Sequence, residues 1–222
     1  MYKKIGVLGG TFNPIHLGHI ELARAAYETY KPDTVLLMPT ARTYYKKEDD
    51  LLDVSVRAEM IDLCIKDYNR DLCSGMFDKN SSRDFMQISM LDAERKGITY
   101  TADTIRELKL LYAGAEIYFI IGSDSLMYLE KWRNADYILS NAIFLVGQRE
   151  NDDIRTISDH IRMLKKEFNA DIRLMPITGF PISSTKIRND ICDKKSISPG
   201  ILSKSVYEFI LDNNLYVSQD HR

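Results

Sequence analysis

The stretch GGTFNPIHLGH, from Gly9 to His19, joins an apolar run at residues 5–8 to residues 20–30, whose apolar side chains recur at helical spacing. The run predicts a buried strand, and the spacing after it predicts an amphipathic helix. Two glycines, an Asn-Pro pair and two histidines three positions apart therefore lie at a strand-to-helix turn. In an open parallel sheet, ligands bind beyond the carboxyl ends of the strands, where the strand order reverses.

Segments of strand and helix character alternate along the rest of the chain. We predict strands at residues 3–8, 34–38, 83–89, 115–122, 141–149 and 171–177. We predict helices at residues 17–30, 54–68, 101–112, 124–132, 154–168, 183–192 and 200–214, with Thr101 as an N-cap and a loop at residues 40–53. This alternation indicates an α/β fold: a Rossmann-like, doubly wound parallel sheet flanked by helices, with a C-terminal helical segment.

Length and composition narrow the class of protein. The 222 residues favour one α/β domain over residues 1–222. With 30 Lys and Arg against 32 Asp and Glu, the net charge of −2 indicates neither a nucleic acid nor a membrane surface as partner. The three cysteines form no Cys-x-x-Cys pair, which argues against a disulfide framework and a structural zinc site. Because the sequence shows neither a signal-peptide pattern nor a membrane-length apolar run, we expect a cytoplasmic protein; its oligomeric state is left open.

The residue types in the first turn suit a polyphosphate. Gly9 and Gly10 have no Cβ, so their backbone N–H groups can approach an anion closely. The helix predicted to begin at residue 17 directs its first N–H groups at the same place. His16 and His19 can both face this pocket, and Gly18 between them leaves room for a flat ligand.

Other interpretations of this turn are weaker. Two histidines are too few ligands for a metal site, and no third ligand lies nearby in the sequence. Both histidines could simply cap or pack the helix. The dinucleotide fingerprint G-x-G-x-x-G is absent, which argues against NAD as a bound redox cofactor.

A second helix start, PISSTKIRND at residues 181–190, carries similar chemistry. Ser183, Ser184 and Thr185 supply hydroxyl groups, and Arg188 follows one turn later. An ordinary Ser/Thr N-cap followed by a surface arginine is the alternative. Two helix starts suited to anions in one sheet protein favour a shared polyphosphate site.

These two stretches resemble motifs of the nucleotidyltransferases, G-x-F-x-P-x-H-x-G-H and I-S-S-T-x-x-R. Between them, ERKGITYTADTIREL resembles the S-Y-T-x-D-T-L stretch of bacterial nicotinate mononucleotide adenylyltransferases. FIIGSDSLMYLEKW resembles their I-G-x-D-x-L…W stretch, and VYEFILDNNLY resembles their C-terminal helix. The matches run in order along nearly the whole chain. The end motifs specify the superfamily, and the middle ones point to this enzyme family.

The resemblance implies that the chain joins ATP and nicotinate mononucleotide to give nicotinate adenine dinucleotide and pyrophosphate, without a covalent intermediate. The 5′-phosphate of the mononucleotide would attack the α-phosphorus of ATP in line. That phosphate is already ionised near neutral pH, so catalysis should rest on positioning and on stabilising charge. Mg²⁺ would bridge ATP oxygens and be held mainly by phosphates and waters.

The resemblance also implies which residues act. His16, His19, Lys46 and Arg188 would contact the reacting phosphates, Lys46 following the pyrophosphate as it leaves. Asp124 would accept ribose hydroxyls or, alternatively, cap a helix, and Arg149 would lie near the adenine or be a surface charge. The implied ATP-binding residues are Gly9, Gly10, Thr11, Phe12, Gly122, Asp124, Arg149, Ser183, Ser184 and Thr185.

On the acceptor side, the resemblance implies that Trp132 stacks on the pyridine ring, although a half-buried core tryptophan would look the same in sequence. Backbone N–H groups near Thr101 and Arg133 would bind the substrate carboxylate. Donors without acceptors favour an acid over an amide, whose NH₂ would face them. We therefore expect nicotinate to be preferred to nicotinamide.

The chain departs from the family at two places. Asn13 stands where the family usually has Asp, and RTYYKK at residues 42–47 replaces P-P-H-[KR], so the role of Lys46 could pass to Lys47. Other functions to weigh are an adenylyltransferase acting on nicotinamide mononucleotide or phosphopantetheine, and a nucleotide-binding sensor without turnover. A redox dehydrogenase is the weakest alternative.

Overall fold

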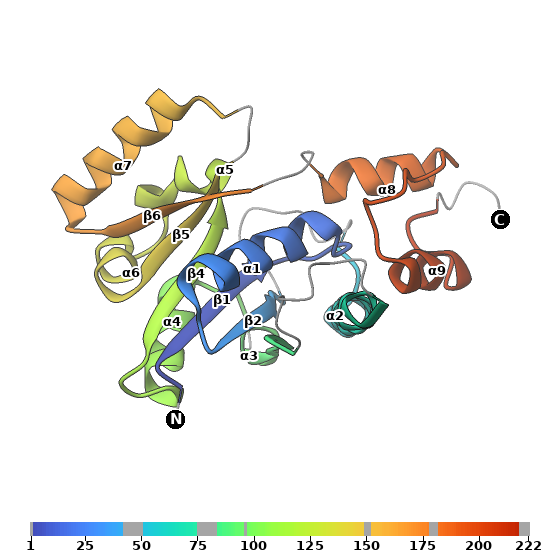
Figure 1. Ribbon diagram of the computed structural model, residues 1–222, viewed down its shortest axis with the longest axis horizontal. Helices are drawn as coiled ribbons and strands as arrows, with labels where there is room; N and C mark the ends of the chain where they lie inside the picture. Colours follow the sequence, from blue (N-terminus) through green and yellow to red (C-terminus); the bar gives the residue numbers. More distant parts are fainter. Residues whose placement is uncertain are drawn as a thin grey trace.

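The computed structural model describes residues 2–41, 51–74, 84–95, 97–148, 152–177 and 182–217, with the backbone alone at residues 71–74. Strands and helices alternate in these parts of the chain (Figure 1). The strands are β1 Lys4–Gly10, β2 Thr34–Pro39, β3 Met86–Ile88, β4 Glu116–Gly122, β5 Ile143–Gln148 and β6 Asp171–Pro176. The helices are α1 Leu17–Tyr30, α2 Val54–Ser74, α3 Leu91–Glu94, α4 Thr101–Leu111, α5 Ser123–Leu126, the 3₁₀ turn Leu129–Lys131, α6 Ala135–Asn141, α7 Ile154–Phe168, α8 Ser184–Cys192 and α9 Lys204–Asp212.

The described strands form one six-stranded parallel sheet in the order β3-β2-β1-β4-β5-β6. The chain winds outward from β1 in one direction, then crosses over and winds outward from β4 in the other. The strand order therefore reverses between β1 and β4, which pair with Val7 opposite Phe119. The predicted α/β, doubly wound class is confirmed, and a ligand crevice is expected at the carboxyl ends of these two strands.

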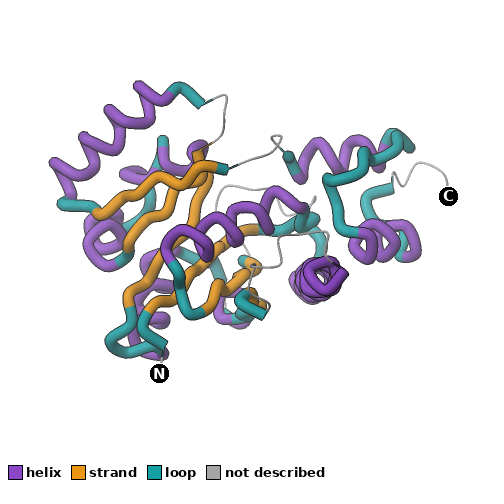
Figure 2. Tube along the Cα trace, in the orientation of Figure 1, coloured by secondary structure: helices purple, strands orange, loops and turns teal. Residues whose placement is uncertain are grey.

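Helices cover both faces of the sheet (Figure 2). Side chains alternate along each strand, so that Leu8 enters the core under α1, α2, α8 and α9 while Val7 enters the core under α4, α6 and α7. Both faces are apolar for this reason, and the strands read as nearly continuous hydrophobic runs in the sequence.

The C-terminal helical segment is fastened to α2. Both carboxylate oxygens of Asp67 accept hydrogen bonds from Ser205, one from its N–H and one from its hydroxyl, each at 2.7 Å. Val206 and Ile210 are fully buried beside them. Figure 1 shows α8 and α9 beyond the carboxyl ends of the strands, next to the start of α1 and α2.

Two sequence predictions need correction, and two helices were missed. The helix predicted at residues 124–132 is broken into α5 and the 3₁₀ turn, because the backbone of Tyr128 leaves the helical region. Helices α3 and α6 were not anticipated. The N-cap of α4 is Tyr100, whose extended backbone ends the preceding segment, so Thr101 is the first helical residue instead. Most of the loop predicted at residues 40–53 lies outside the described residues.

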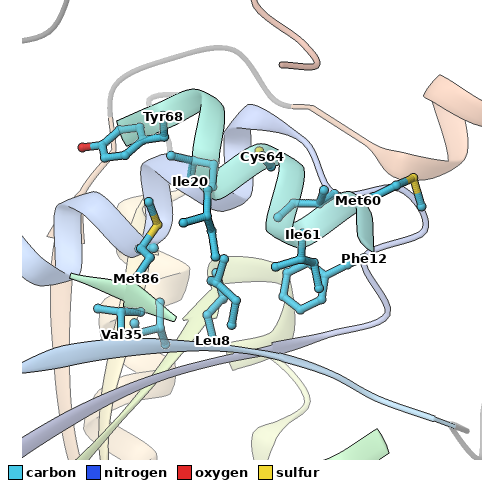
Figure 3. Packing of buried hydrophobic residues seen from close by; sticks show 14 of the residues in the cluster. Leu8, Phe12, Ile20, Val35, Met60, Ile61, Cys64, Tyr68 and Met86 are labelled. Carbon is cyan, nitrogen blue, oxygen red and sulfur yellow. The ribbon is translucent and has the colours of Figure 1, made fainter. Parts of the chain in front are cut away.

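Truncating a core side chain should cost far more than truncating an exposed one. Ile61 is fully buried in the cluster that includes Phe12 (Figure 3), whereas Leu110 is 80% exposed. Ile61→Ala should lower the free energy of unfolding by about 2–5 kcal/mol, and Leu110→Ala should change it by less than about 0.5 kcal/mol. Urea unfolding followed by circular dichroism measures both values, and similar values would contradict the assigned core.

Candidate active site

The carboxyl ends of β1 and β4 lie side by side and carry glycines. Gly10 ends β1, and its carbonyl accepts hydrogen bonds from the N–H of Thr40 at 3.0 Å and from its hydroxyl at 3.3 Å. Gly122 ends β4, and a side chain there would collide with the carboxylate of Asp124. Asp124 is therefore folded back over the end of β4, in the first turn of α5, and it is exposed. The N-cap of α5 is Gly122, so the alternative in which Asp124 is that cap does not hold.

The turn after β1 is bound directly to the start of α8. Arg188 donates from Nη1 to the carbonyl of Asn13 at 2.9 Å. The hydroxyl of Ser184 donates to the carbonyl of Pro14, also at 2.9 Å. These contacts join residues about 170 positions apart and bring the first turns of α1 and α8 to the same place. The two helix starts singled out in the sequence are neighbours in the fold.

His16 and His19 form a compact pair at the start of α1. Their rings stack with centroids 3.7 Å apart, and the N–H of His16 donates to Nδ1 of His19 at 3.2 Å. Because Nδ1 of His19 accepts, a neutral His19 carries its proton on Nε2. A Cβ at Gly18 would lie 3.1 Å from the His16 ring, so glycine here makes room for that ring. The capping role and a phosphate-binding role are therefore compatible.

The hydroxyl groups at the start of α8 differ in their contacts. Ser183 is the N-cap, and its side chain accepts from the N–H of Lys186 at 3.4 Å. The Ser184 hydroxyl donates to the carbonyl of Pro14, whereas the side chain of Thr185 is exposed. Each hydroxyl oxygen keeps acceptor capacity, and Ser183 and Thr185 are both exposed, whereas Ser184 is only partly so.

The predicted acceptor-binding residues also meet across elements. The guanidinium of Arg133 stacks 4.3 Å above the ring of Tyr100, which directly precedes Thr101. Trp132 lies edge-on to Phe119 of β4 at 6.4 Å and is partly buried. The start of α4 and the Trp132 segment are thus adjacent, and Trp132 contacts β4 at Phe119.

A buried polar cluster fixes the first turn of α4. The hydroxyl of Thr104 donates to the carboxylate of Asp92 at 2.5 Å, and Arg95 forms ion pairs with Asp92 and Glu107. Burial raises the pKa of the Asp92 carboxyl, although Thr104 and Arg95 favour its charged form. This cluster orients α4 and with it the backbone at Thr101.

Sequence reasoning missed two residues that contact the first turn. Tyr216 donates its hydroxyl to the side-chain oxygen of Asn13 at 2.9 Å, and burial raises the pKa of that phenol. Arg57 of α2 donates to the carbonyl of Thr11. The burial of Arg57 could have been predicted from the sequence, because Arg57 lies on the same face of α2 as Ile61 and other apolar residues. No comparable pattern pointed to Tyr216.

Several predicted residues lie outside the described residues. These are Lys46, Lys47 and Arg149. Among the residues that the structure describes, no group of three or more His, Cys, Asp and Glu could hold a metal ion. No helix in the described ranges is long and apolar enough to cross a membrane.

Comparison with known proteins places the chain in a family. Residues 7–190 match the profile of the family described as cytidylyltransferase-like. The probable nicotinate-nucleotide adenylyltransferase of Lachnoclostridium phytofermentans is 33% identical over 215 residues, covering 97% of this chain and all of the relative. That of Carboxydothermus hydrogenoformans is 32% identical over 213 residues, covering 96% of this chain and 98% of the relative.

Solved structures share the fold. The nicotinic acid mononucleotide adenylyltransferase of Plasmodium falciparum complexed with NaAD superposes with a TM-score of 0.75 at 19% identity, covering 96% of this chain and 97% of that chain. A putative nicotinate-nucleotide adenylyltransferase from Vibrio parahaemolyticus superposes with a TM-score of 0.64 at 23% identity, covering 96% and 95%. At these identities the likeness concerns the fold.

Removing the Tyr216 hydroxyl should loosen the turn. Tyr216→Phe deprives the buried Asn13 oxygen of its 2.9 Å donor and should lower the free energy of unfolding by about 1–2 kcal/mol. Tyr128→Phe, at an exposed tyrosine, is the matched control and should leave stability unchanged. Thermal and urea unfolding measure the two variants. Equal stability of Tyr216→Phe and the wild type would show that this hydrogen bond does not anchor the C-terminal segment.

Proposed function

The chain belongs to the cytidylyltransferase-like family and, within it, to the nicotinate-nucleotide adenylyltransferases, and on that premise we propose that it transfers the adenylyl group of ATP to nicotinate mononucleotide, giving nicotinate adenine dinucleotide and pyrophosphate. This is a step of NAD biosynthesis. Residues 1–222 act as one nucleotidyltransferase domain, and a cytoplasmic location fits the cysteine usage.

One observation carries this proposal. The first turns of α1 and α8 are joined at Asn13 and Pro14, so their N–H groups and the Arg188 guanidinium converge beside the carboxyl end of β1. Helix N-termini and guanidinium groups stabilise phosphate oxygens. In the proposed reaction the triphosphate lies over this junction, between the Gly9–Phe12 turn and Thr185.

The mechanism needs no nucleophile on the protein. The ionised 5′-phosphate of the mononucleotide attacks the α-phosphorus in line and displaces pyrophosphate. His16 and His19 stabilise the charge that develops on the transferred phosphoryl group, His19 donating from Nε2. Arg188 and Thr185 hold the ATP phosphates, and Lys46 or Lys47 follows the leaving pyrophosphate. Asp124 binds ribose hydroxyls at the end of β4.

Mg²⁺ accompanies ATP in this proposal. When bound, it would neutralise part of the phosphate charge, with most of its ligands supplied by phosphates and waters. The chain contributes the arrangement of the phosphates, through the turn and the two helix starts. The role assigned to Arg149 in this proposal is contact with the adenine.

The acceptor binds between the start of α4 and the Trp132 segment. Trp132 stacks on the pyridine ring, and the backbone N–H groups near Thr101 and Arg133 bind its carboxylate. The Arg133–Tyr100 contact at 4.3 Å supports this arrangement, because it holds the two backbone segments together.

The decisive experiment supplies the purified chain with ATP, Mg²⁺ and nicotinate mononucleotide and measures pyrophosphate release. We expect turnover that depends on both nucleotides. ATP binding without pyrophosphate release would instead support a nucleotide-binding sensor, and turnover with phosphopantetheine in place of the mononucleotide would contradict the proposed acceptor.

Each histidine of the pair should be needed for turnover. His16→Ala and His19→Ala remove donors from the transition state and should each lower kcat by about 10²–10³-fold, as the loss of an oxyanion donor does. His160→Ala is the control, because His160 lies on α7 and pairs with Glu130. Steady-state kinetics measure all three. Normal rates in both site variants would mean that the histidines serve only to cap α1.

The enzyme should prefer nicotinate mononucleotide to nicotinamide mononucleotide. Backbone N–H groups can pair with the nicotinate carboxylate, whereas an amide presents its own NH₂ to some of them and leaves donors unpaired. We expect kcat/KM to be at least about tenfold higher for nicotinate mononucleotide than for nicotinamide mononucleotide. Competition between the two acceptors in one assay measures the ratio, and a ratio near one would contradict the assigned acceptor contacts.

A further inference from the structure

Arg57 of α2 is a buried cation bound to backbone. The residue is 1% exposed. Its guanidinium donates to three carbonyl groups: that of Thr11 from Nη1 at 2.6 Å, that of Leu52 from Nε at 2.8 Å, and that of Ala41 from Nη2 at 3.5 Å. A single side chain thus connects α2, the end of the β2 segment and the turn after β1.

Within the described ranges, Arg57 forms no ion pair with a carboxylate. Asp53 is the acidic residue of its own helix start, but that carboxylate is exposed and accepts hydrogen bonds from the N–H and hydroxyl of Ser55. Burial lowers the pKa of Arg57, yet a guanidinium remains charged in proteins. A full positive charge is therefore buried inside the molecule, next to the turn between β1 and α1. Its hydrogen-bond partners are backbone carbonyl groups. Desolvating such a charge is costly.

The contact with Thr11 fixes one peptide group. In a trans peptide the C=O and the following N–H point in opposite directions, so the N–H of Phe12 points away from Arg57. Phe12 has a positive φ of 47° and is 1% exposed as a residue, and its ring centroid lies 4.9 Å from that of His19. A non-glycine residue holds such a backbone conformation only where its surroundings impose it. Arg57 on one side and the buried ring on the other supply that constraint.

We infer that Arg57 is a positioning residue of the polyphosphate site: it holds the Thr11–Phe12 peptide so that the Phe12 N–H faces the bound anion. Its charge also polarises that peptide, because hydrogen bonds in series strengthen one another and a buried charge is little screened by salt. The inference rests on the proposed function, which assigns this turn to the phosphates of ATP. It accounts for a charged side chain on the apolar face of α2.

The test separates charge, shape and turnover. Isothermal titration calorimetry measures binding of inorganic tripolyphosphate and of adenosine to the full chain and its variants. Arg57→Met should weaken tripolyphosphate binding by about tenfold to a hundredfold and change adenosine binding by less than about twofold. Arg57→Lys should recover part of the loss, because an ammonium keeps the charge but cannot hold three carbonyls in a planar fork.

A matched control guards against a general loss of structure. Arg24→Met removes a partly buried arginine of α1 that pairs with Glu21 and Glu28, and it should leave both affinities unchanged. Equal weakening of adenosine and tripolyphosphate by Arg57→Met, or no weakening of either, would overturn the inference. These binding measurements do not depend on pyrophosphate release. A wild-type chain without turnover would contradict the proposed function. A selective loss of tripolyphosphate binding in Arg57→Met would still support the anion site.

Discussion

The turn between β1 and α1 has to satisfy its carbonyl groups without the help of a sheet or a helix, and the rest of the site follows from how it does so. Three of its carbonyls, and that of Gly10 at the end of β1, accept hydrogen bonds from other parts of the chain. The acceptors are Gly10, Thr11, Asn13 and Pro14, and the donors are Thr40, Arg57, Arg188 and Ser184 respectively. The donors come from the end of β2, from α2 and from α8. Elements far apart in the chain are therefore locked around one short stretch of backbone.

The same hydrogen bonds set the electrostatics of the crevice. The carbonyl oxygens of Gly10, Thr11 and Pro14 point toward their hydrogen-bond donors across trans peptides, so the N–H groups that follow them point the other way. The first turns of α1 and α8 add further N–H donors. The stacked pair of His16 and His19 adds donors without requiring two adjacent positive charges, because Nδ1 of His19 accepts a backbone N–H. In the proposed site, oriented dipoles and the two guanidinium groups of Arg57 and Arg188 would be the main attraction for anions. Such a site suits a reaction whose nucleophile and leaving group are both phosphates.

The C-terminal segment also contacts the turn between β1 and α1. Asp67 of α2 binds the first turn of α9, and Tyr216 beyond α9 donates to the side chain of Asn13. An amide oxygen at residue 13 accepts this bond as a carboxylate would, which explains in physical terms why Asn can occupy a position where relatives of this kind usually have Asp. The C-terminal segment thus contacts the turn directly, through Tyr216.

The sequence by itself determined the α/β class, the bounds of α1 and α7, and the two helix starts suited to anions, because hydrophobic periodicity and turn composition are local properties of the chain. Only the tertiary structure decided that Ser184 and Arg188 hold the first turn, that Arg57 lies buried behind it, and that Tyr100 caps α4. These contacts join residues from 46 to more than 170 positions apart, or depend on a backbone conformation imposed by packing. A hydrogen bond between distant segments leaves no periodic trace in either segment, and so it becomes visible only once the sheet has brought the strand ends together.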